Sequence, residues 1–320
     1  ADIPVAGDRK TISLNGIWEC TTTSDTASEL PYEYDNRIQV PGLWDIAGRD
    51  LGSYDGKSLW YRTTVRTGKI PERVTLRINK AQFGTYVYVN GKPVGEYTYI
   101  FTPSQFDIAP FLKQDEDNEI VIRLQNKKYQ QDNPKSLGHL GFDGERKYYW
   151  PGIYDDVSLI VSGNPVVSYL QTAPDIDQGT VYARAFLKND SASSRTTPVT
   201  FRVYRLGIMA DGVEPAIPEL VAEYQVKDVS VPAGKETVVS VPAMALKGYD
   251  KGRDVWSPDN PALYKLVVST SGDTFGQRFG MRTFRFDETT KMPILNGKPH
   301  YLRGTNIAFN RFCDDPARKD

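Results

Sequence analysis

The chain has 320 residues, 39% of them hydrophobic and 25% charged, so it is longer than one ordinary domain and can form packed cores. It carries 39 Lys and Arg residues against 40 Asp and Glu residues, a formal net charge of -1. No basic field exists to bind a phosphate backbone, so we do not expect nucleic acid as a partner. No stretch approaches the roughly 20 apolar residues of a membrane-spanning helix, so we expect no membrane partner.

Short runs of alternating apolar and polar residues follow one another along the chain, at residues 73–79, 119–124, 181–187 and 199–203. A period of two over such short runs predicts half-buried β-strands. Asn90-Gly91 lies between two strand-like runs and predicts a tight hairpin turn. Because no segment shows a sustained helical stripe, we predict an all-β protein built from sandwiches of the jelly-roll and immunoglobulin types.

The punctuation of these runs predicts three units. The strand-like sequence DDVSLIV closes a first unit, residues 1–163, and strands begin again after the loop GNPVV. A second unit covers residues 164–287 and contains a long loop from Gly207 to Pro218. Residues 288–320 begin a third unit that is too short to bury a core of its own.

General catalytic and metal-binding motifs are absent. There is no Gly-rich phosphate loop and no GxSxG turn, and the two histidines, His139 and His300, are not spaced for a metal site. The acidic run at residues 115–117 has the oxygen ligands that calcium prefers, although a solvated loop is the favoured interpretation. Cys20 and Cys313 lie far apart, and we do not predict a disulfide between them. We therefore expect neither a metal nor a cofactor in this chain.

A series of motifs occurs in a fixed order. They are LNGIWEC, VPGLWD, LWYRTTV, a stretch from FGTYVYVNGKPVGEY to NEIVIRL, WPGIYDDVSL, VWSPDNPALYKL with FGMRTFRF, and LNGKPHYLRGTN. This order resembles glycoside hydrolase family 2, the β-galactosidase, β-glucuronidase and β-mannosidase group, over nearly the whole chain. The resemblance implies a galactose-binding-like jelly roll over residues 1–163, an immunoglobulin-like sandwich over 164–287, and the first segment of a (β/α)8 barrel over 288–320.

Several residues in these motifs have a structural interpretation. Trp18, Trp44, Trp60 and Tyr61 are predicted to anchor a sandwich core. Gly152, in WPGIYDDV, is predicted to permit either a close backbone approach or a bend. These residues build a scaffold and carry no chemistry.

The catalytic residues of the family are two carboxylates, a nucleophile and an acid/base. The resemblance places both beyond Asp320, so we assign no catalytic residue here. In relatives, loops of the first domain help to hold the sugar, and one such loop lies shortly before the glycine that matches Gly152. In several relatives it carries an Asp six residues upstream, where this chain has Arg146. Asp143 and Glu145 are close enough to replace that Asp.

Two further candidates follow from the resemblance. Asp55 lies in a second loop, ahead of LWYRTTV, and is predicted to contribute to substrate binding. Asn306 in RGTN matches the family and is a substrate-binding candidate, or else only caps a barrel strand. Galactosidase relatives continue this motif with a His where this chain has Ala308, which counts against a plain β-galactosidase.

Three functions compete. The resemblance favours the N-terminal region of a retaining exo-glycosidase that hydrolyses terminal β-linked sugars, with this chain alone inactive. A non-catalytic carbohydrate-binding protein is the second, because jelly rolls also serve as lectin domains. A structural or adhesion module is the third, because a fold alone does not give function. For the favoured reading we expect a carbohydrate substrate as partner and a periplasmic or secreted location, and we leave a homo-oligomer open.

Overall fold

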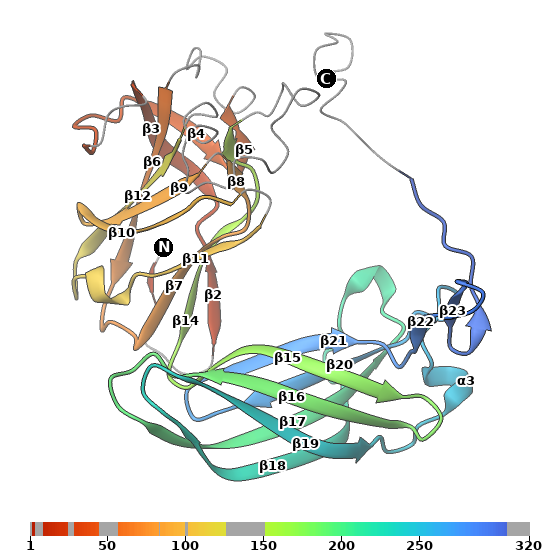
Figure 1. The fold of residues 1–320 in the computed structure, drawn as a ribbon. Helices are drawn as coiled ribbons and strands as arrows, with labels where there is room; N and C mark the ends of the chain where they lie inside the picture. The colour runs from red at the N-terminus through yellow and green to blue at the C-terminus, as the bar shows by residue number, and fades with distance from the viewer. Residues whose placement is uncertain are drawn as a thin grey trace. The chain divides into compact units, whose positions relative to one another are not determined.

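The computed structural model describes residues 2–3, 9–24, 29–44, 57–82, 84–99, 102–125 and 151–305. The described chain divides into two compact units (Figure 1). Unit 1 contains residues 2–3 and the described residues from 10 to 161, and unit 2 contains Arg9 and residues 162–305. Both are built almost entirely from strands, as the period-two runs predict.

Unit 1 contains a seven-stranded sheet in the order β10-β9-β12-β6-β3-β4, with β1 added parallel to β6. Its strands are β1 (Asp2–Ile3), β3 (Gly16–Ser24), β4 (Asn36–Val40), β6 (Lys57–Thr67), β9 (Thr85–Val89), β10 (Lys92–Tyr97) and β12 (Asp117–Leu124). The hairpin of β9 and β10 turns at Asn90 and Gly91, whose φ angles are 50° and 77°, which confirms the predicted tight turn.

Two smaller sheets complete unit 1. The order β11-β7-β14-β2 joins β2 (Lys10–Ser13), β7 (Arg73–Ile78), β11 (Ser104–Asp107) and β14 (Val157–Ser162). The order β5-β13-β8 joins the two-residue strands β5 (Gly42–Leu43), β8 (Ala81–Gln82) and β13 (Gly152–Ile153). A short 3-10 helix, η2 (Ala109–Phe111), precedes β12.

The core of unit 1 lies between the large sheet and the four-stranded sheet. Inward residues such as Val74, Leu76 and Ile78 of β7 are at most 1% exposed, as the alternation predicts. Trp18, Trp44 and Tyr61 belong to this core. Trp60 is also fully buried, but strand neighbours point to opposite faces, and its Nε1 donates to Oγ1 of Thr23 at 2.7 Å.

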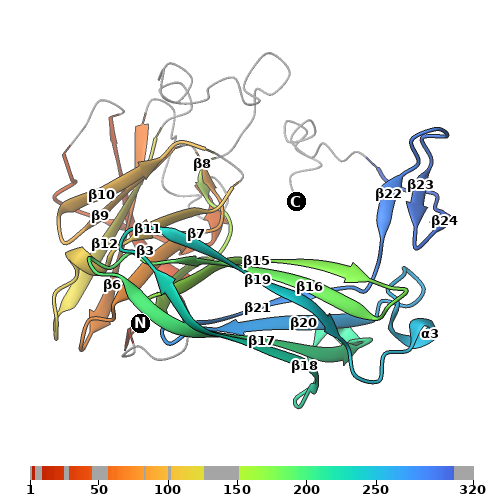
Figure 2. The ribbon, with the colours of Figure 1, turned by 60° about the horizontal axis from the view of Figure 1, so that its bottom comes forward.

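Unit 2 is a sandwich of two sheets (Figure 2). One has the order β15-β16-β19, from β15 (Val166–Asp175), β16 (Thr180–Lys188) and β19 (Glu236–Ala245). The other has the order β18-β17-β20-β21, from β17 (Arg195–Gly207), β18 (Glu219–Val231), β20 (Leu263–Ser269) and β21 (Thr274–Phe279). The loop between β17 and β18 contains the short 3-10 helix η3 (Ala210–Gly212).

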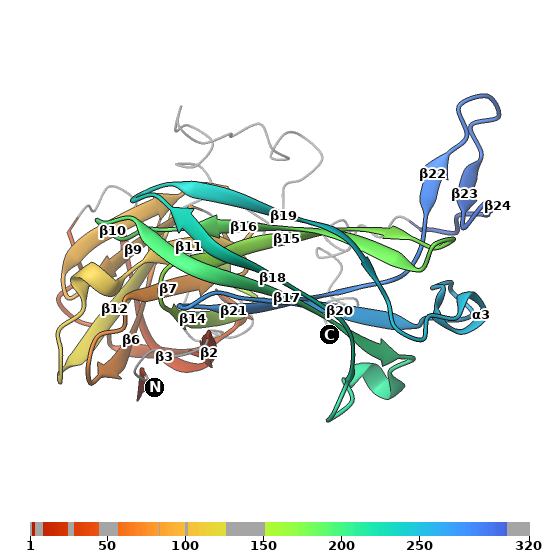
Figure 3. The same cartoon turned by 90° about the horizontal axis from the view of Figure 1, so that it is seen from below.

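A short helix and a small sheet extend unit 2 beyond its two layers (Figure 3). The helix is α3 (Lys251–Asp254), and the sheet β22-β23-β24 is formed by β22 (Phe284–Phe286), β23 (Pro293–Leu295) and β24 (Lys298–Pro299). The described part of the predicted barrel segment, residues 288–305, lies in unit 2. The barrel itself stays a prediction.

Arg9 is held in unit 2 by a buried ion pair. Its Nε and Nη2 donate to the Asp273 carboxylate at 3.0 and 2.7 Å, and its Nη2 also donates to the carbonyl of Val167 at 2.6 Å. The Asp273 side chain is fully buried and also accepts the amide N–H of Val167 at 2.7 Å. One carboxylate therefore fixes the start of β15 and the residue that precedes β2.

Cys20 lies in the core of unit 1 without a disulfide, and Cys313 lies outside the described residues. Burial, with a contribution from the nearby Asp35 carboxylate, raises the pKa of the Cys20 thiol to about 12. A thiol with such a pKa stays protonated at neutral pH and is chemically inert.

Candidate functional site

The described site is the end of unit 1 that flanks two segments with candidate residues, 45–56 and 126–150. All four candidates of the first unit (Asp55, Asp143, Glu145 and Arg146) lie outside the described residues, as does Asn306. Nothing in the structure brings them together or separates them. The residues that flank their loops are described, however, and they define this end of the molecule.

The flanking residues of the two loops meet on neighbouring strands. Residues 45–56 follow Trp44, and residues 126–150 precede Pro151. The amide N–H of Trp44 donates to the carbonyl of Pro151 at 2.9 Å, and Leu43 pairs with Gly152 in antiparallel register. The residues that precede segment 45–56 and follow segment 126–150 therefore lie side by side.

Gly152 makes this attachment sterically possible. Its φ angle is 154°, and a Cβ atom there would lie 2.6 Å from the carbonyl oxygen of Gly42 and 2.9 Å from the Cα atom of Leu43. No larger residue fits such a contact without a backbone shift. The predicted close backbone approach at Gly152 is confirmed.

The other ends of the same loops meet on the large sheet. Lys57 begins β6 and pairs with Ser24, the last residue of β3. Leu124 ends β12, pairs with Leu59 of β6, and is followed by Gln125, whose N–H donates to the carbonyl of Gly84 at 3.1 Å. The described residues on either side of both segments, 45–56 and 126–150, therefore lie at one edge of unit 1.

Beneath this edge lies a set of buried aromatic residues. The rings of Trp44 and Tyr61 meet edge to face with centroids 5.6 Å apart, and burial raises the pKa of Tyr61. On the other side of β6, the guanidinium of Arg123 lies 5.3 Å from the Trp60 ring and 5.6 Å from the Tyr86 ring, and its Nε donates to Oγ of Ser58 at 3.0 Å. Rigid anchors of this kind fix where a loop starts and ends.

Two polar atoms at this edge have no hydrogen-bond partner within the part of the chain that the structure describes. They are Nε1 of Trp44 and Oε1 of Gln125, and their residues are only 1% and 3% exposed. A buried polar group without a partner costs about 1–3 kcal/mol. A hydrogen-bond acceptor for Nε1 of Trp44 and a donor for Oε1 of Gln125 would therefore stabilise this edge.

The described carboxylates with shifted pKa values all have a lowered pKa, which is the opposite of what a general acid needs. Backbone and side-chain hydrogen bonds lower the pKa of Asp155 and hold that of Asp287 at about 2. Burial opposes ionisation of Asp254, but hydrogen bonds from Arg253 and from the Asp250 N–H keep its pKa below the usual value. A glycosidase acid needs a raised pKa, so none of the three fits that role.

The acidic run at residues 115–117 is exposed and leads from a turn into the first residue of β12. Asp117 pairs with Arg66 at 3.2 Å and Glu116 with Lys113 at 3.7 Å, while Asp115 adopts a positive φ of 60°. Within the described residues, no group of three or more His, Cys, Asp or Glu side chains is placed to hold a metal ion.

Unit 2 has a hollow of about 990 Å³. One side is formed by α3 and the turn at residues 257–260, and the other side is formed by the segment 295–303. Nδ2 of Asn296 donates to the carbonyl of Trp256 at 2.9 Å and holds the turn between β23 and β24 against this wall. The lining includes the cationic side chains Lys251, Lys298 and Arg303 together with His300. Its boundary is formed by the last described residues, so we assign no site to it.

The described residues of the two units form a β-strand scaffold, and the edge of unit 1 flanks the two segments that carry candidate residues. Residues 35–149 match the family model "Glycosyl hydrolase 2 galactose-binding domain-like". Unit 1 therefore contains a domain that matches the galactose-binding-like domain of glycoside hydrolase family 2.

Relatives extend over nearly the whole chain. A β-galactosidase of Bacteroides ovatus is 27% identical over 95% of this chain, and a β-glucuronidase of Bacteroides fragilis is 24% identical over 94%. The crystal structure of a Bacteroides uniformis β-glucuronidase is 25% identical and superposes with a TM-score of 0.70 over 93% of this chain. The chain spans only 35% of the B. ovatus relative, 42% of the B. fragilis relative and 35% of the crystallised chain.

Sequence reasoning missed the anchoring sheet β5-β13-β8. Its strands have two residues each, too few for a period to be recognised. Two signals point to it, the glycine of WPGIYDDV and the Pro-Gly of VPGLWD, because Gly42 and Gly152 approach each other here.

Proposed function

We propose that the protein of which this chain forms a part is a retaining exo-glycosidase that hydrolyses terminal β-linked sugars. The observation that carries the proposal is the match to family 2 glycosidases over nearly all of this chain but only about a third of the first relative's length. The catalytic pair then belongs to the remaining length, on the loop-bearing face of a (β/α)8 barrel that residues 288–320 begin. No hydrolysis is expected of the 320-residue chain alone.

We propose that the edge of unit 1 around Trp44 and Pro151 presents substrate-binding groups to that barrel. Support comes from the pairing of Leu43 with Gly152, which attaches the loop of Asp55 beside the loop that holds Asp143, Glu145 and Arg146. Carboxylate, guanidinium and amide groups are the donors and acceptors that sugar hydroxyls need. Asn306 would add an amide from the start of the barrel.

Unit 2 is proposed to be an immunoglobulin-like sandwich over residues 164–287. Its first, second and fifth strands form one sheet, while the third, sixth and seventh lie together in the other, with the fourth at its edge. An immunoglobulin constant-type domain also separates A, B and E from C, F and G, but its fourth strand, D, lies with A, B and E. A periplasmic or secreted location remains a proposal that follows from the expected substrate class, and a homo-oligomer remains a separate proposal.

A carbohydrate-binding function without hydrolysis is the second candidate. The galactose-binding-like domain favours it, because β-sandwiches of this class bind sugars without a catalytic pair. Under this proposal the chain alone retains all of its affinity for glycans.

The experiment compares the 320-residue chain with the protein extended to its native stop codon, on chromogenic α- and β-glycosides. Cleavage of a β-glycoside by the extended protein alone supports the glycosidase, and the cleaved sugar identifies its specificity. Asp143→Asn and Asp55→Asn in the extended protein are expected to raise KM about tenfold each, as loss of a charged hydrogen bond does. Glu96→Gln is the control, because Glu96 is exposed on β10. Glycan binding by both proteins without cleavage by either favours the second candidate.

A further inference from the structure

The outer face of the sheet β15-β16-β19 in unit 2 has an unusual set of side chains. Exposed residues alternate with buried ones along β16, so Tyr182, Arg184 and Phe186 point outward. Tyr182 is 53% exposed and Tyr169, on β15, is 44% exposed. We call the surface formed by Tyr169, Gln171, Tyr182, Arg184, Phe186 and Ser240 the Arg184 face.

Two irregularities in the strand register shape this face. On β15, Ser168 is an extra residue between Val167 and Tyr169, and its Oγ donates to the carbonyl of Phe186 at 2.8 Å. On the edge strand β19, Pro242 and Ala243 together oppose the single residue Tyr182. Bulges bend a strand and redirect its side chains, and an edge strand tolerates Pro because that strand needs no outer partner.

The first bulge creates an aromatic platform. The rings of Tyr169 and Phe186 stack with centroids 3.9 Å apart and an interplanar angle of 12°. Tyr182 lies four residues from Phe186 on the same strand, about 13 Å away at 3.3 Å per residue. The face therefore presents aromatic surface at two places separated by more than one sugar ring.

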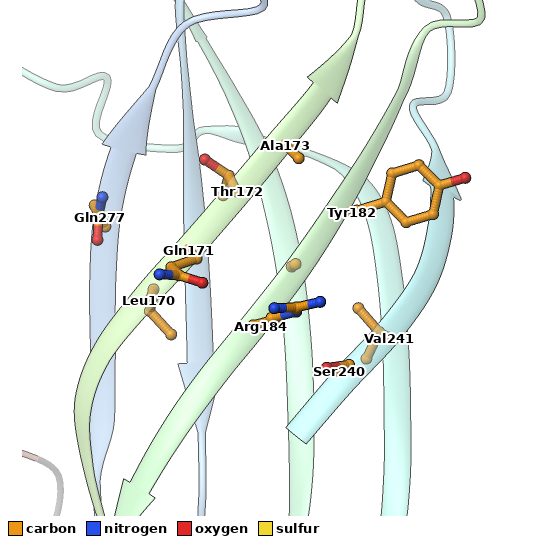
Figure 4. A pocket seen from close by; sticks show the side chains of 10 residues that line it. Leu170, Gln171, Thr172, Ala173, Tyr182, Arg184, Ser240, Val241 and Gln277 are labelled. Carbon is orange, nitrogen blue, oxygen red and sulfur yellow. The ribbon is translucent and has the colours of Figure 1, made fainter. Parts of the chain in front are cut away.

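Between the two aromatic places runs a row of polar groups. Gln171, Arg184 and Ser240 are paired directly across the three strands. They line a shallow hollow of about 720 Å³ with Tyr182 and with Gln277 of β21 (Figure 4). Amide, guanidinium and hydroxyl groups in one row can donate to and accept from several hydroxyls of one ligand.

Charge decides what kind of ligand fits. The lining of the hollow contains no Asp or Glu. The Arg184 side chain forms no ion pair or hydrogen bond with the residues described, whereas that of Arg202, on the opposite sheet, pairs with Glu223 at 2.6 Å. Glu236, on β19 of the same sheet, accepts a hydrogen bond from Ser168. A free guanidinium favours a carboxylate, which it binds through two parallel hydrogen bonds.

We propose that the Arg184 face binds an oligosaccharide that carries a uronate carboxylate. The carboxylate pairs with Arg184, the sugar rings lie against Tyr182 and the Tyr169–Phe186 stack, and the hydroxyls bond to Gln171, Gln277 and Ser240. The binding surface belongs to unit 2 alone and requires no hydrolysis. It therefore goes beyond the proposed glycosidase activity and does not depend on it.

The test measures binding to the 320-residue chain by isothermal titration calorimetry. The probes are a hyaluronan oligosaccharide, which contains glucuronate, and a neutral chitin-derived oligosaccharide of equal length. We expect the acidic probe to bind at least tenfold more tightly, and its affinity to fall as salt is added. Equal affinity for both probes, or no heat from the acidic probe at millimolar concentration, overturns the proposal.

Matched variants locate the site. Arg184→Gln and Tyr182→Ala are expected to weaken binding of the acidic probe about tenfold each. The first removes the cation that pairs with the carboxylate, and the second removes the aromatic ring that contacts a sugar ring. The controls Lys227→Gln and Tyr224→Ala change the same kinds of group on β18 of the opposite sheet, where both are exposed. Circular dichroism confirms that all four variants fold. Loss of binding in the controls, or unchanged binding in the first pair, overturns the proposal.

The extended protein provides a further test that hydrolysis does not affect. If it binds the acidic probe with the same dependence on Arg184, the face is open in the whole protein and the proposal stands, whether or not a glycoside is cleaved. If the short chain binds and the extended protein does not, the rest of the chain covers the face and the proposal is wrong.

Discussion

The ion pair of Arg9 with Asp273 makes a quantitative prediction about unit 2. In Asp273→Asn the new amide can still accept the N–H of Val167, but it no longer neutralises Arg9. Removing one partner of a buried pair costs about 3–5 kcal/mol. Because the Arg9 side chain is 16% exposed, water screens part of its charge. We therefore expect a loss of stability at the lower end of this range, about 3 kcal/mol.

The reverse change is expected to cost more. Arg9→Gln leaves the Asp273 carboxylate with 0% exposure and only the Val167 N–H as a partner. Because both changes break the same interaction, the double variant is expected to lose less stability than the sum of the two, by at least about 1.5 kcal/mol. Asp259→Asn, in an exposed turn, is the control and is expected to change stability by less than about 0.5 kcal/mol.

Urea unfolding followed by circular dichroism gives the free energies. Hydrogen exchange with mass spectrometry assigns the loss to a unit, because peptides from β15 and β21 should lose protection while those from β12 of unit 1 keep theirs. The reasoning is refuted if Asp273→Asn costs less than about 1 kcal/mol, or if the single effects add without coupling.

Three further predictions concern single residues. Gly152→Ala places a Cβ 2.6 Å from the Gly42 carbonyl oxygen and should destabilise unit 1 by at least about 2 kcal/mol in urea unfolding. The control Gly68→Ala, whose Cβ would have its nearest neighbour at 3.9 Å, should cost less than about 1 kcal/mol. Similar costs for the two variants would contradict the close approach at Gly152. Because the folded protein lowers the pKa of Asp254, its ionised carboxylate stabilises unit 2 at pH values above the ordinary pKa of about 4, and this stabilisation is lost as the pH falls through the folded pKa. The difference in unfolding free energy between the protein and Asp254→Asn should therefore be large at pH 7 and shrink in acid. A difference that does not depend on pH would refute this prediction. Iodoacetamide at pH 8 should label Cys20 only after unfolding, because burial raises its pKa to about 12, and labelling of the native chain in a peptide mass map would show that the thiol is accessible.

The strands were predictable because their signal is local. The alternation at residues 73–78 places one set of side chains inside, and a sandwich has no other place for them. The turn at Asn90-Gly91 follows from residues that tolerate a positive φ. The partners of each strand were not predictable, because pairing such as that of β12 with β6 and β9 joins segments far apart in the chain.

The functional surfaces depend on irregularities that carry no period. The bulge at Ser168 places Tyr169 on the outer face with Phe186, and strict alternation would place Tyr169 inside. The partner of Asp273 lies 264 residues away, and no spacing rule connects two such positions. The substrate-binding candidates came from the family resemblance alone, and they lie outside the described residues.

The route of the chain through residues 2–13 bears on how the protein is synthesised. Ile3 pairs with β6 in unit 1, Arg9 neutralises Asp273 in unit 2, and β2 returns to unit 1 beside β14. During synthesis, nearly all strands of unit 1 are available once residue 161 has left the ribosome. More than a hundred further residues must then be made before Asp273, the counter-ion of Arg9, is present. Domains fold as units during synthesis at about 5–20 residues per second, so this interval lasts on the order of ten seconds. During it the start of β15 has no carboxylate to bind, and unit 2 can complete its fold only when the β20–β21 turn leaves the exit tunnel.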